Sequence, residues 1–245
     1  MISKFRLALS FLTIFPVGKM NNISEDAWAE STLLYPVCGY IIGLITITPI
    51  FLLNYFFTIS PLLLAAITVA LLALITGALH LDGFADVCDG FFCPTGSKER
   101  RLEIMHDPHI GTFGVVGLII LLLIKFVSFF VLIRNGEFLS IGAIVVLARF
   151  SMVLLAATST YPTEKGIGKF IVGKISKLTL LLSFILILPC CFSIRILITA
   201  GIMLCIIFIL KLASNKLIGG VTGDVLGACS EITETIGLLT LTIMT

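Results

Sequence analysis

Three aspartates follow one another closely in the segment HLDGFADVCDG, residues 80–90. They are Asp82, Asp86 and Asp89, spaced i, i+4 and i+7, so their carboxylates would lie along one face of a helix. Carboxylates stacked in this way repel one another, and a divalent cation with oxygen ligands would offset the repulsion. Mg²⁺ suits such a set best, because it takes one or two carboxylates and completes its shell with waters and substrate phosphates. The spacing therefore predicts a magnesium site, with a solvated acidic loop as the alternative.

A second charged segment, KERRLEIMHDPHIGTFG at residues 98–114, adds a fourth carboxylate at Asp107 next to several basic residues. Acids beside bases suit a phosphoanhydride, because a metal can bind its bridging oxygens while a guanidinium binds the others. The basic residues are Lys98, Arg100 and Arg101, of which either arginine could supply such a guanidinium, and Glu103 could hold an arginine in place. An exposed amphipathic helix with ion pairs one turn apart is the alternative.

A third segment, GGVTGDVLGACSEITE at residues 219–234, places Asp224 between glycines and then supplies Glu231 and Glu234. A simple turn between two helices is the alternative for its first half. Lys125 and Arg149 stand inside long apolar stretches, where an unpaired cation costs about 2.5–3.5 kcal/mol even on insertion scales. We therefore expect both cations to face the interior, paired with acids or with an anionic substrate, whereas snorkelling to the membrane surface would be the alternative.

Histidine and cysteine residues flank the aspartates and raise the question of a zinc site. His80, His106, His109, Cys88 and Cys93 match no closed four-ligand spacing, so zinc is disfavoured. His80 could orient a ligand or a substrate group, or it could be a structural histidine at a helix end. The seven cysteines form no CxxC pair, and we expect them to be free.

The elements that must position these residues are membrane-spanning helices. The chain has 245 residues, is 58% hydrophobic and only 12% charged, and has a mean hydropathy of +1.17. These values predict an all-α, polytopic integral membrane helical bundle with about six to seven transmembrane helices, in a single domain over residues 1–245. The candidate spans are Leu33–Phe57, Pro61–His80, Phe113–Ile133, Phe138–Tyr161, Leu178–Ser193, Ile196–Leu212 and a shorter Glu231–Thr245. Three polar connections, at 81–112, 161–177 and 213–230, would then lie on one side of the membrane.

The distribution of Lys and Arg predicts the orientation, because cationic loops stay on the cytoplasmic side. Twelve cations fall on the side of the N-terminus, and only Arg134 and Arg195 fall on the other side. The twelve are Lys4, Arg6, Lys19, Lys98, Arg100, Arg101, Lys165, Lys169, Lys174, Lys177, Lys211 and Lys216. We therefore expect a multi-pass protein of the bacterial inner membrane whose acidic segments face the cytoplasm. The first segment, MISKFRLALSFLTIFPVG, is expected to lie as an amphipathic helix in the membrane interface.

Taken together, GALHLDGFADVCDG, RRLEIMHDPHIGTFG and GGVTGDVLGACSEITE resemble the signature segments of the cobalamin synthase family, the adenosylcobinamide-GDP ribazoletransferases. The resemblance extends from FLTIFPVG near the N-terminus, through YPVCGYIIGL and the Arg149 region, to the last acidic segment. It covers nearly the whole chain, and the order and spacing of several long motifs make it specific.

The resemblance implies a membrane-embedded, Mg²⁺-dependent transferase that joins adenosylcobinamide-GDP to α-ribazole, or to its 5'-phosphate, and releases GMP. It places the metal ligands at Asp82, Asp86, Asp89 and Asp107, and further acidic positions at Asp224, Glu231 and Glu234. Matching basic positions, expected to bind substrate together with Glu231 and Glu234, are Arg100, Lys125, Arg149 and Lys174. Asp224 or Asp107 would accept the proton of the attacking hydroxyl, and the choice between them stays open. Partners would be the two small-molecule substrates and the lipid bilayer, with no nucleic acid, and a homo-oligomer is left open.

The chain departs from the family pattern at two places. Ile14 stands where the family often has an arginine, and Pro108 and His109 stand where it commonly has serine and arginine. The loss of two permanent cations bears on substrate affinity more than on the chemistry.

Two other classes of protein use acidic residues near a membrane. The CDP-alcohol phosphotransferases carry a DGxxAR pattern, but here Asp82 and Gly83 are followed by Phe84, Ala85 and Asp86. A divalent-cation transporter should have acids at the midplane of several spans, whereas most acids of this chain gather at one side. Both classes are therefore less favoured than the transferase.

Overall fold

The computed structural model describes residues 2–18, 23–94, 96–163 and 166–245, and within them it contains helices and no strand. The helices are α1 (Ile2–Leu12), α2 (Glu25–Ser31), η1 (Thr32–Leu34), α3 (Tyr35–Phe56), α4 (Pro61–Ile75), α5 (Leu79–Phe92), α6 (Lys98–Met105), α7 (Thr112–Arg134), α8 (Phe138–Ala157), η2 (Ile167–Phe170), α9 (Lys177–Ile187), η3 (Leu188–Cys190), α10 (Ile194–Ile218) and α11 (Gly223–Ile243). The all-α membrane bundle predicted from the composition is confirmed.

Within the described residues, five helical stretches are long and apolar enough to cross a membrane, and the number rises to six if a bent helix pair counts as one span. The five are Glu25–Phe56, which runs through α2, η1 and α3, and then α7, α8, α10 and α11; the bent pair is α4 with α5. The count therefore falls at the lower end of the predicted range.

Two of the predicted spans need correction. The span expected at Leu178–Ser193 is only the short apolar stretch Lys177–Cys190, because α9 gives way to a 3-10 turn around Pro189, whose nitrogen carries no hydrogen to donate. The short last span is instead the full-length helix α11, which begins at Gly223 rather than Glu231. The polar connection expected at 213–230 shrinks accordingly to residues 219–222, between α10 and α11.

The second predicted span does not continue straight into the helix that carries the aspartates. α4 ends at Ile75, and α5 leaves it at an angle of 89°. Gly77 and Ala78 between them both have positive φ, a conformation that ends a helix and that glycine adopts without strain. The segment after α1 stabilises this break, because the backbone nitrogen of Ile14 donates a hydrogen bond to the carbonyl oxygen of Ile75 at 2.9 Å.

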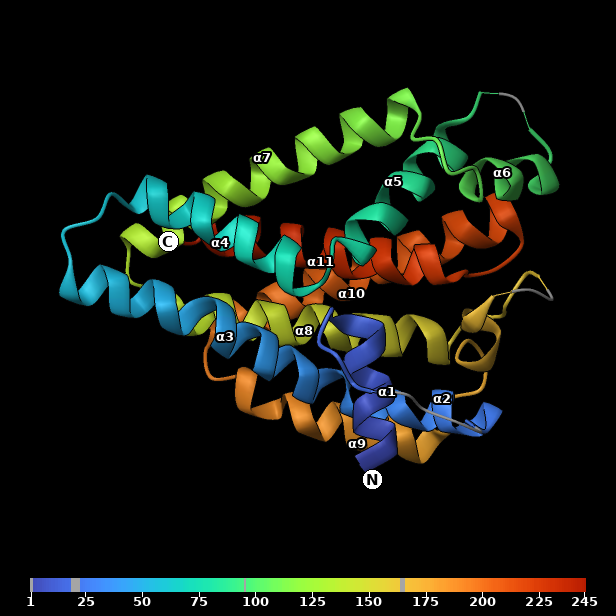
Figure 1. Cartoon of the computed structure of the whole chain (residues 1–245), viewed down its shortest axis with the longest axis horizontal. Coiled ribbons are helices and arrows are strands. Elements are labelled where there is room, and N and C mark those ends of the chain that lie inside the picture. The colour runs from blue at the N-terminus through green and yellow to red at the C-terminus, as the bar shows by residue number, and fades with distance from the viewer. Residues whose placement is uncertain (1, 19–22, 95, 164–165) are drawn as a thin grey trace.

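α11 lies at the centre of the bundle, where it packs against α5, α7, α8 and α10. Figure 1 shows the long helices running in roughly one direction, with α1 lying across them. The C-terminal half of α5, α6 and the start of α11 gather at one end of the molecule, which we call the acidic end. The α3–α4 loop and the α7–α8 turn lie at the opposite end.

Some of the cations predicted to face the cytoplasm belong to α6 and to the segment that leads into α9, and both elements lie at the acidic end. Arg134, predicted to lie on the other side, is the last residue of α7 at the opposite end. Lys19 and Lys165 of that set lie outside the described residues. α1 buries Leu7, Ala8 and Leu12 against the bundle and leaves Ile2 exposed, so its placement in the membrane interface stays a prediction. All seven cysteines are free, as expected.

Candidate functional site

Two glycines bring α5 and α11 into close contact. A Cβ atom at Gly83 of α5 would lie 2.9 Å from the Cα atom of Asp224, and one at Gly227 of α11 would lie 3.2 Å from the Cα atom of His80. Neither distance leaves room for a larger residue without a shift of backbone. The absence of these two side chains therefore lets the aspartate helix lie directly against the start of α11.

This contact joins two acidic segments that are far apart in the sequence. Asp86 lies within electrostatic range of Asp224 across the helix contact and of Asp82 on its own helix. Asp82 is exposed, and Asp86 and Asp224 are partly buried. The Oγ1 atom of Thr222, the residue that caps α11, donates to the Oδ2 atom of Asp224 at 3.3 Å. We call Asp82, Asp86 and Asp224 the aspartate cluster.

The donor set of the aspartate cluster fits Mg²⁺. Within the described part of the chain, no group of three or more His, Cys, Asp or Glu side chains is arranged to hold a metal ion. Mg²⁺ does not require such a closed set, because it keeps several waters and is commonly bound by one or two carboxylates together with substrate phosphates. Asp86 and Asp224 lie on two packed helices within electrostatic range of each other, so a divalent cation between them would relieve the repulsion of their carboxylates.

Asp89 lies on the same helix, and both oxygens of its carboxylate already accept hydrogen bonds. Its Oδ2 atom accepts a hydrogen bond from the backbone nitrogen of Gly111 at 2.7 Å, and its Oδ1 atom accepts one from Gly114 at 2.9 Å. These donors belong to the first turn of α7, whose N–H groups have no partner within the helix. A carboxylate also complements the positive end of the helix dipole. This placement favours a capping role for Asp89 over the predicted role as a metal ligand.

Asp107 and Arg100 are at the surface of the acidic end. Asp107 accepts hydrogen bonds from the backbone nitrogen of His109 at 2.9 Å and from its ring Nδ1 atom at 2.8 Å. The backbone hydrogen bond from His109 holds the pKa of Asp107 below its usual range, which makes Asp107 a weaker proton acceptor. Arg100 pairs with Glu103 at 3.0 Å, as the sequence suggested, and Lys174 is exposed between η2 and α9.

Arg101 was expected only as one of several basic residues beside the acids, and the structure shows a more specific contact. Its Nη1 atom donates to the carbonyl oxygens of Gly90 and Phe91, each at 2.7 Å. These carbonyls lie in the last turn of α5, where a helix leaves its acceptors unpaired and favours a cation. Arg101 therefore fastens α6 to the end of the aspartate helix.

The segment between α8 and α9 covers the start of α11. The backbone nitrogen of Val221 donates to the carbonyl of Thr160 at 2.9 Å, and a Cβ atom at Gly168 would lie 3.2 Å from the nitrogen of Gly223. Tyr161 of this segment lies within electrostatic range of Asp224, and burial raises the pKa of its phenol. Nothing in the spacing of the sequence singled out Tyr161, because its neighbours along the chain carry no charged motif.

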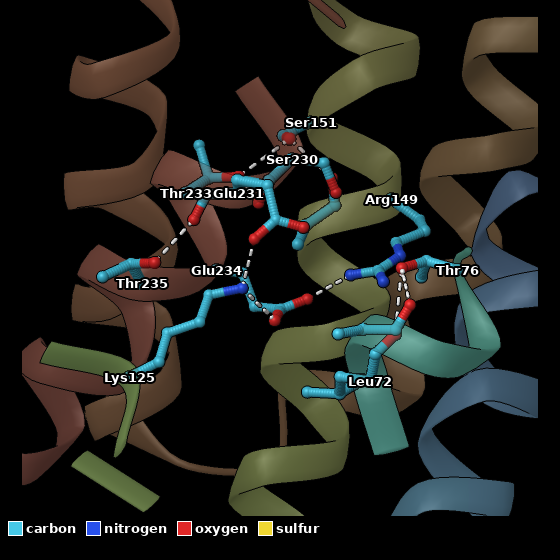
Figure 2. Close-up of polar contacts among 12 residues, drawn as sticks. Leu72, Thr76, Lys125, Arg149, Ser151, Ser230, Glu231, Thr233, Glu234 and Thr235 are labelled. Carbon is cyan, nitrogen blue, oxygen red and sulfur yellow. Dashed lines mark hydrogen bonds and ion pairs between the residues drawn. The ribbon is translucent and has the colours of Figure 1, made fainter. Parts of the chain in front are cut away.

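Lys125 and Arg149 do face the interior, where they meet the two glutamates of α11. Lys125 binds both Glu231 and Glu234, the latter at 2.8 Å, and Arg149 binds Glu234. Figure 2 shows the two cations approaching Glu234 from different sides. All four side chains are at most 5% exposed. We call these four residues the buried ion network; it connects α7, α8 and α11.

The buried ion network leaves little room for a substrate. The cavity beside it has a volume of about 10 Å³, which is room for about one water molecule. Its walls include Thr76 at the break after α4, which Figure 2 shows beside Arg149. Of the alternatives that the sequence left open, the structure favours pairing of these cations with acids over contact with an anionic substrate.

His80 is also in the interior, with 2% of its surface exposed. Its backbone packs against Gly227, and its ring lies within electrostatic range of Arg149 and Glu234. It therefore belongs to the surroundings of the buried ion network, whereas the neighbouring Asp82 is exposed.

The fold and the site together define a polytopic helical membrane protein with a carboxylate cluster at one end and a charged network in its core. The model of the cobalamin-5-phosphate synthase family matches residues 4–242, and the chain belongs to that family. A relative from Acinetobacter baumannii (strain ACICU), named adenosylcobinamide-GDP ribazoletransferase, is 37% identical over 98% of this chain and 96% of its own. Relatives of the same name from Clostridium botulinum (strain Okra / Type B1) and Syntrophobacter fumaroxidans are 33% and 36% identical, over 98% and 96% of this chain and 97% and 96% of theirs. No solved structure matches the chain.

Proposed function

We propose that this protein is an adenosylcobinamide-GDP ribazoletransferase. It joins adenosylcobinamide-GDP to α-ribazole, or to α-ribazole 5'-phosphate, and releases GMP in the assembly of the cobalamin nucleotide loop. The observation that carries the proposal is the family match over residues 4–242, together with relatives of that name that align with nearly the whole chain.

The chemistry is a phosphoryl transfer in which one bond to phosphorus replaces another. A hydroxyl oxygen of the ribazole ribose attacks the phosphorus that carries cobinamide, and the anhydride bond to GMP breaks. The hydroxyl proton needs an acceptor, and Asp224 is better placed than Asp107, because it is partly buried within the aspartate cluster whereas Asp107 is exposed and bonded to His109.

We further propose that Mg²⁺ is the cofactor and that two carboxylates of the aspartate cluster, Asp86 and Asp224, hold it together with waters and substrate phosphates, with Asp82 beside them. A bound Mg²⁺ would neutralise charge on the diphosphate oxygens and on the departing GMP. The exposed cations Arg100 and Lys174 near this end are candidates for binding the outer phosphate oxygens. Through α11, the buried ion network fixes the position of Asp224 relative to α7 and α8, so we assign its four residues a positioning role.

The proposed location is the bacterial inner membrane, with the aspartate cluster facing the cytoplasm. The cation asymmetry of the sequence supports this orientation, since the acidic end carries the lysines and arginines of α6 and of the segment before α9. Adenosylcobinamide-GDP would then enter the site from the cytoplasm.

The test is turnover by the purified protein in detergent, supplied with adenosylcobinamide-GDP and α-ribazole. We expect equal amounts of cobalamin and GMP in the presence of Mg²⁺ and none after chelation with EDTA. Asp86→Asn should lower the rate by about 100-fold, in the range seen when an enzyme loses a group that stabilises transition-state charge. Asp26→Asn, which changes an exposed acid in the first turn of α2, is the matched control and should retain the rate. No turnover by well-folded wild-type protein would overturn the proposal.

A further inference from the structure

The end of the bundle opposite to the acidic end contains a hollow. It has a volume of about 820 Å³ and lies between α3, α8 and the turn that follows η3. Its floor includes Ile47, Phe138 and Cys190, which are at most 9% exposed. Leu44 and Phe192 at its edges are exposed. The hollow is therefore a groove with an apolar floor that opens to the surroundings of the helices.

A missing side chain helps to create this groove. A Cβ atom at Gly142 of α8 would meet nothing within 4 Å, and one at Gly43 of α3 would lie 3.6 Å from the Cα atom of Gly142. α3 and α8 thus approach closely at this level, while the space in front of Gly142 is left open. A volume of this size falls in the range of about 300–1,000 Å³ that small-molecule pockets occupy.

A charged pair borders the apolar floor. Glu137 lines the groove and accepts hydrogen bonds from the Oγ atom of Ser140 and from the Nη2 atom of Arg195, each at 2.6 Å. The hydroxyl of Ser140 and the guanidinium of Arg195 hold the pKa of Glu137 below its usual range. The acid is therefore charged and already satisfied by two donors.

Two arginines at this end of the bundle, Arg195 and Arg134, have guanidinium groups that can donate further hydrogen bonds. The structure gives Arg195 no acceptor among the described side chains other than Glu137, and its side chain is 36% exposed. Arg134 is exposed three residues before Glu137, at the end of α7. Arg134 lies two residues before Gly136, which lines the groove, and Arg195 is bonded to Glu137, which also lines it. Two arginines thus accompany one glutamate, so the turn beside the groove carries a net positive charge.

We propose that this groove is a binding site for a single anionic phospholipid of the bilayer. One acyl chain would lie on the apolar floor beside Gly142, and the phosphate would accept hydrogen bonds from Arg195 and Arg134. A phosphate suits the planar, forked donors of arginine better than a neutral headgroup does. The depth of the groove agrees with this arrangement, because α7 ends here while α8 and α10 begin here, so Arg134 and Arg195 stand at the ends of spans, where lipid headgroups begin.

Glycine substitutions provide a matched pair of variants for the test. Gly142→Leu should fill the groove, whereas Gly201→Leu adds the same side chain to an exposed position of α10 where a Cβ atom also meets nothing within 4 Å. Each protein would be released from nanodiscs of phosphatidylcholine with phosphatidylglycerol and weighed by native mass spectrometry. We expect wild type and Gly201→Leu to retain one phosphatidylglycerol, and Gly142→Leu to retain at least about tenfold less, a difference that corresponds to 1.4 kcal/mol.

A measurement on the wild type alone keeps the proposal testable if Gly142→Leu does not fold. A phosphatidylglycerol with a photoreactive group in its acyl chain should label residues 43–51 and 136–143 in preference to the exposed face of α10. Equal labelling of both regions, retention of lipid by folded Gly142→Leu, or retention of phosphatidylcholine in equal measure would overturn the proposal. A dimer whose interface covers the groove would overturn it as well.

Discussion

At the scale of single residues, the spacing of the acids predicted a shared helix but could not predict the contacts of each carboxylate. Asp82, Asp86 and Asp89 have helical spacing and lie on one helix, as predicted. Only the tertiary structure shows that Asp86 lies within electrostatic range of Asp224 while Asp89 accepts hydrogen bonds from the start of α7. The division depends on where α7 and α11 begin, and this information is spread over residues more than 20 positions away along the chain.

The two roles predict different consequences for the same substitution. Asp89→Asn should lower the free energy of unfolding by about 1–2 kcal/mol, since it weakens a helix cap, while it leaves turnover within about tenfold of wild type. Asp86→Asn should leave stability unchanged or raised, because it removes repulsion from Asp224, and should lose turnover. Thermal unfolding in detergent and the rate of GMP release would be measured for both. The capping role is wrong if Asp89→Asn loses turnover as fully as Asp86→Asn at unchanged stability.

At the scale of elements, the apolar runs of the sequence located most of the membrane-spanning helices. The predicted bounds were wrong where a helix continues through polar or charged residues. Glu231 was expected to begin a short last span because a charged residue usually marks the end of an apolar run. Its charge is instead matched by Lys125 from α7, so α11 extends eight residues further toward its N-terminus. The break after α4 was missed for a similar reason, because it depends on contact with Ile14, which is far away in the sequence.

Charge pairing inside the bundle predicts a specific pattern of stability. Lys125→Met should lower the free energy of unfolding by about 3–5 kcal/mol, because it leaves Glu231 buried and without its cation. The double variant Lys125→Met with Glu231→Gln removes both charges and should recover most of this loss, while Glu234 stays paired with Arg149. Unfolding in denaturant would be followed for the two single variants and the double variant. Additive losses would show that the residues do not interact as the structure indicates.

At the scale of the whole molecule, the bundle separates its charges along the direction of its spans. The aspartate cluster and the cations of α6 lie at the acidic end, and the groove, with Arg195 bonded to Glu137 beside it, lies at the opposite end. The sequence predicted this separation through the positions of its lysines and arginines. The sequence did not predict the groove, because the groove depends on how α3, α8 and η3 pack around glycines such as Gly142 and not on any sequence motif.

The orientation of the bundle can be tested by labelling single cysteines. In a background without the native cysteines, Glu99→Cys on α6 and Asn135→Cys in the α7–α8 turn would report the two ends, since both positions are exposed. A membrane-impermeant maleimide should label Asn135→Cys from the outside of intact cells and Glu99→Cys only in inverted vesicles. The reverse pattern would place the aspartate cluster outside the cytoplasm and contradict the proposed location.

The central claim is that carboxylates of α5 and α11, brought together by Gly83 and Gly227, hold the metal for the transfer. The most direct test is a Mg²⁺ titration of GMP release by wild type, Asp86→Asn and Asp224→Asn in detergent, with Asp26→Asn as the control. We predict that each cluster variant either needs at least about tenfold more Mg²⁺ for half-maximal rate or loses about 100-fold in rate at saturation, while the control follows wild type. Titrations of both cluster variants that coincide with wild type would contradict the account.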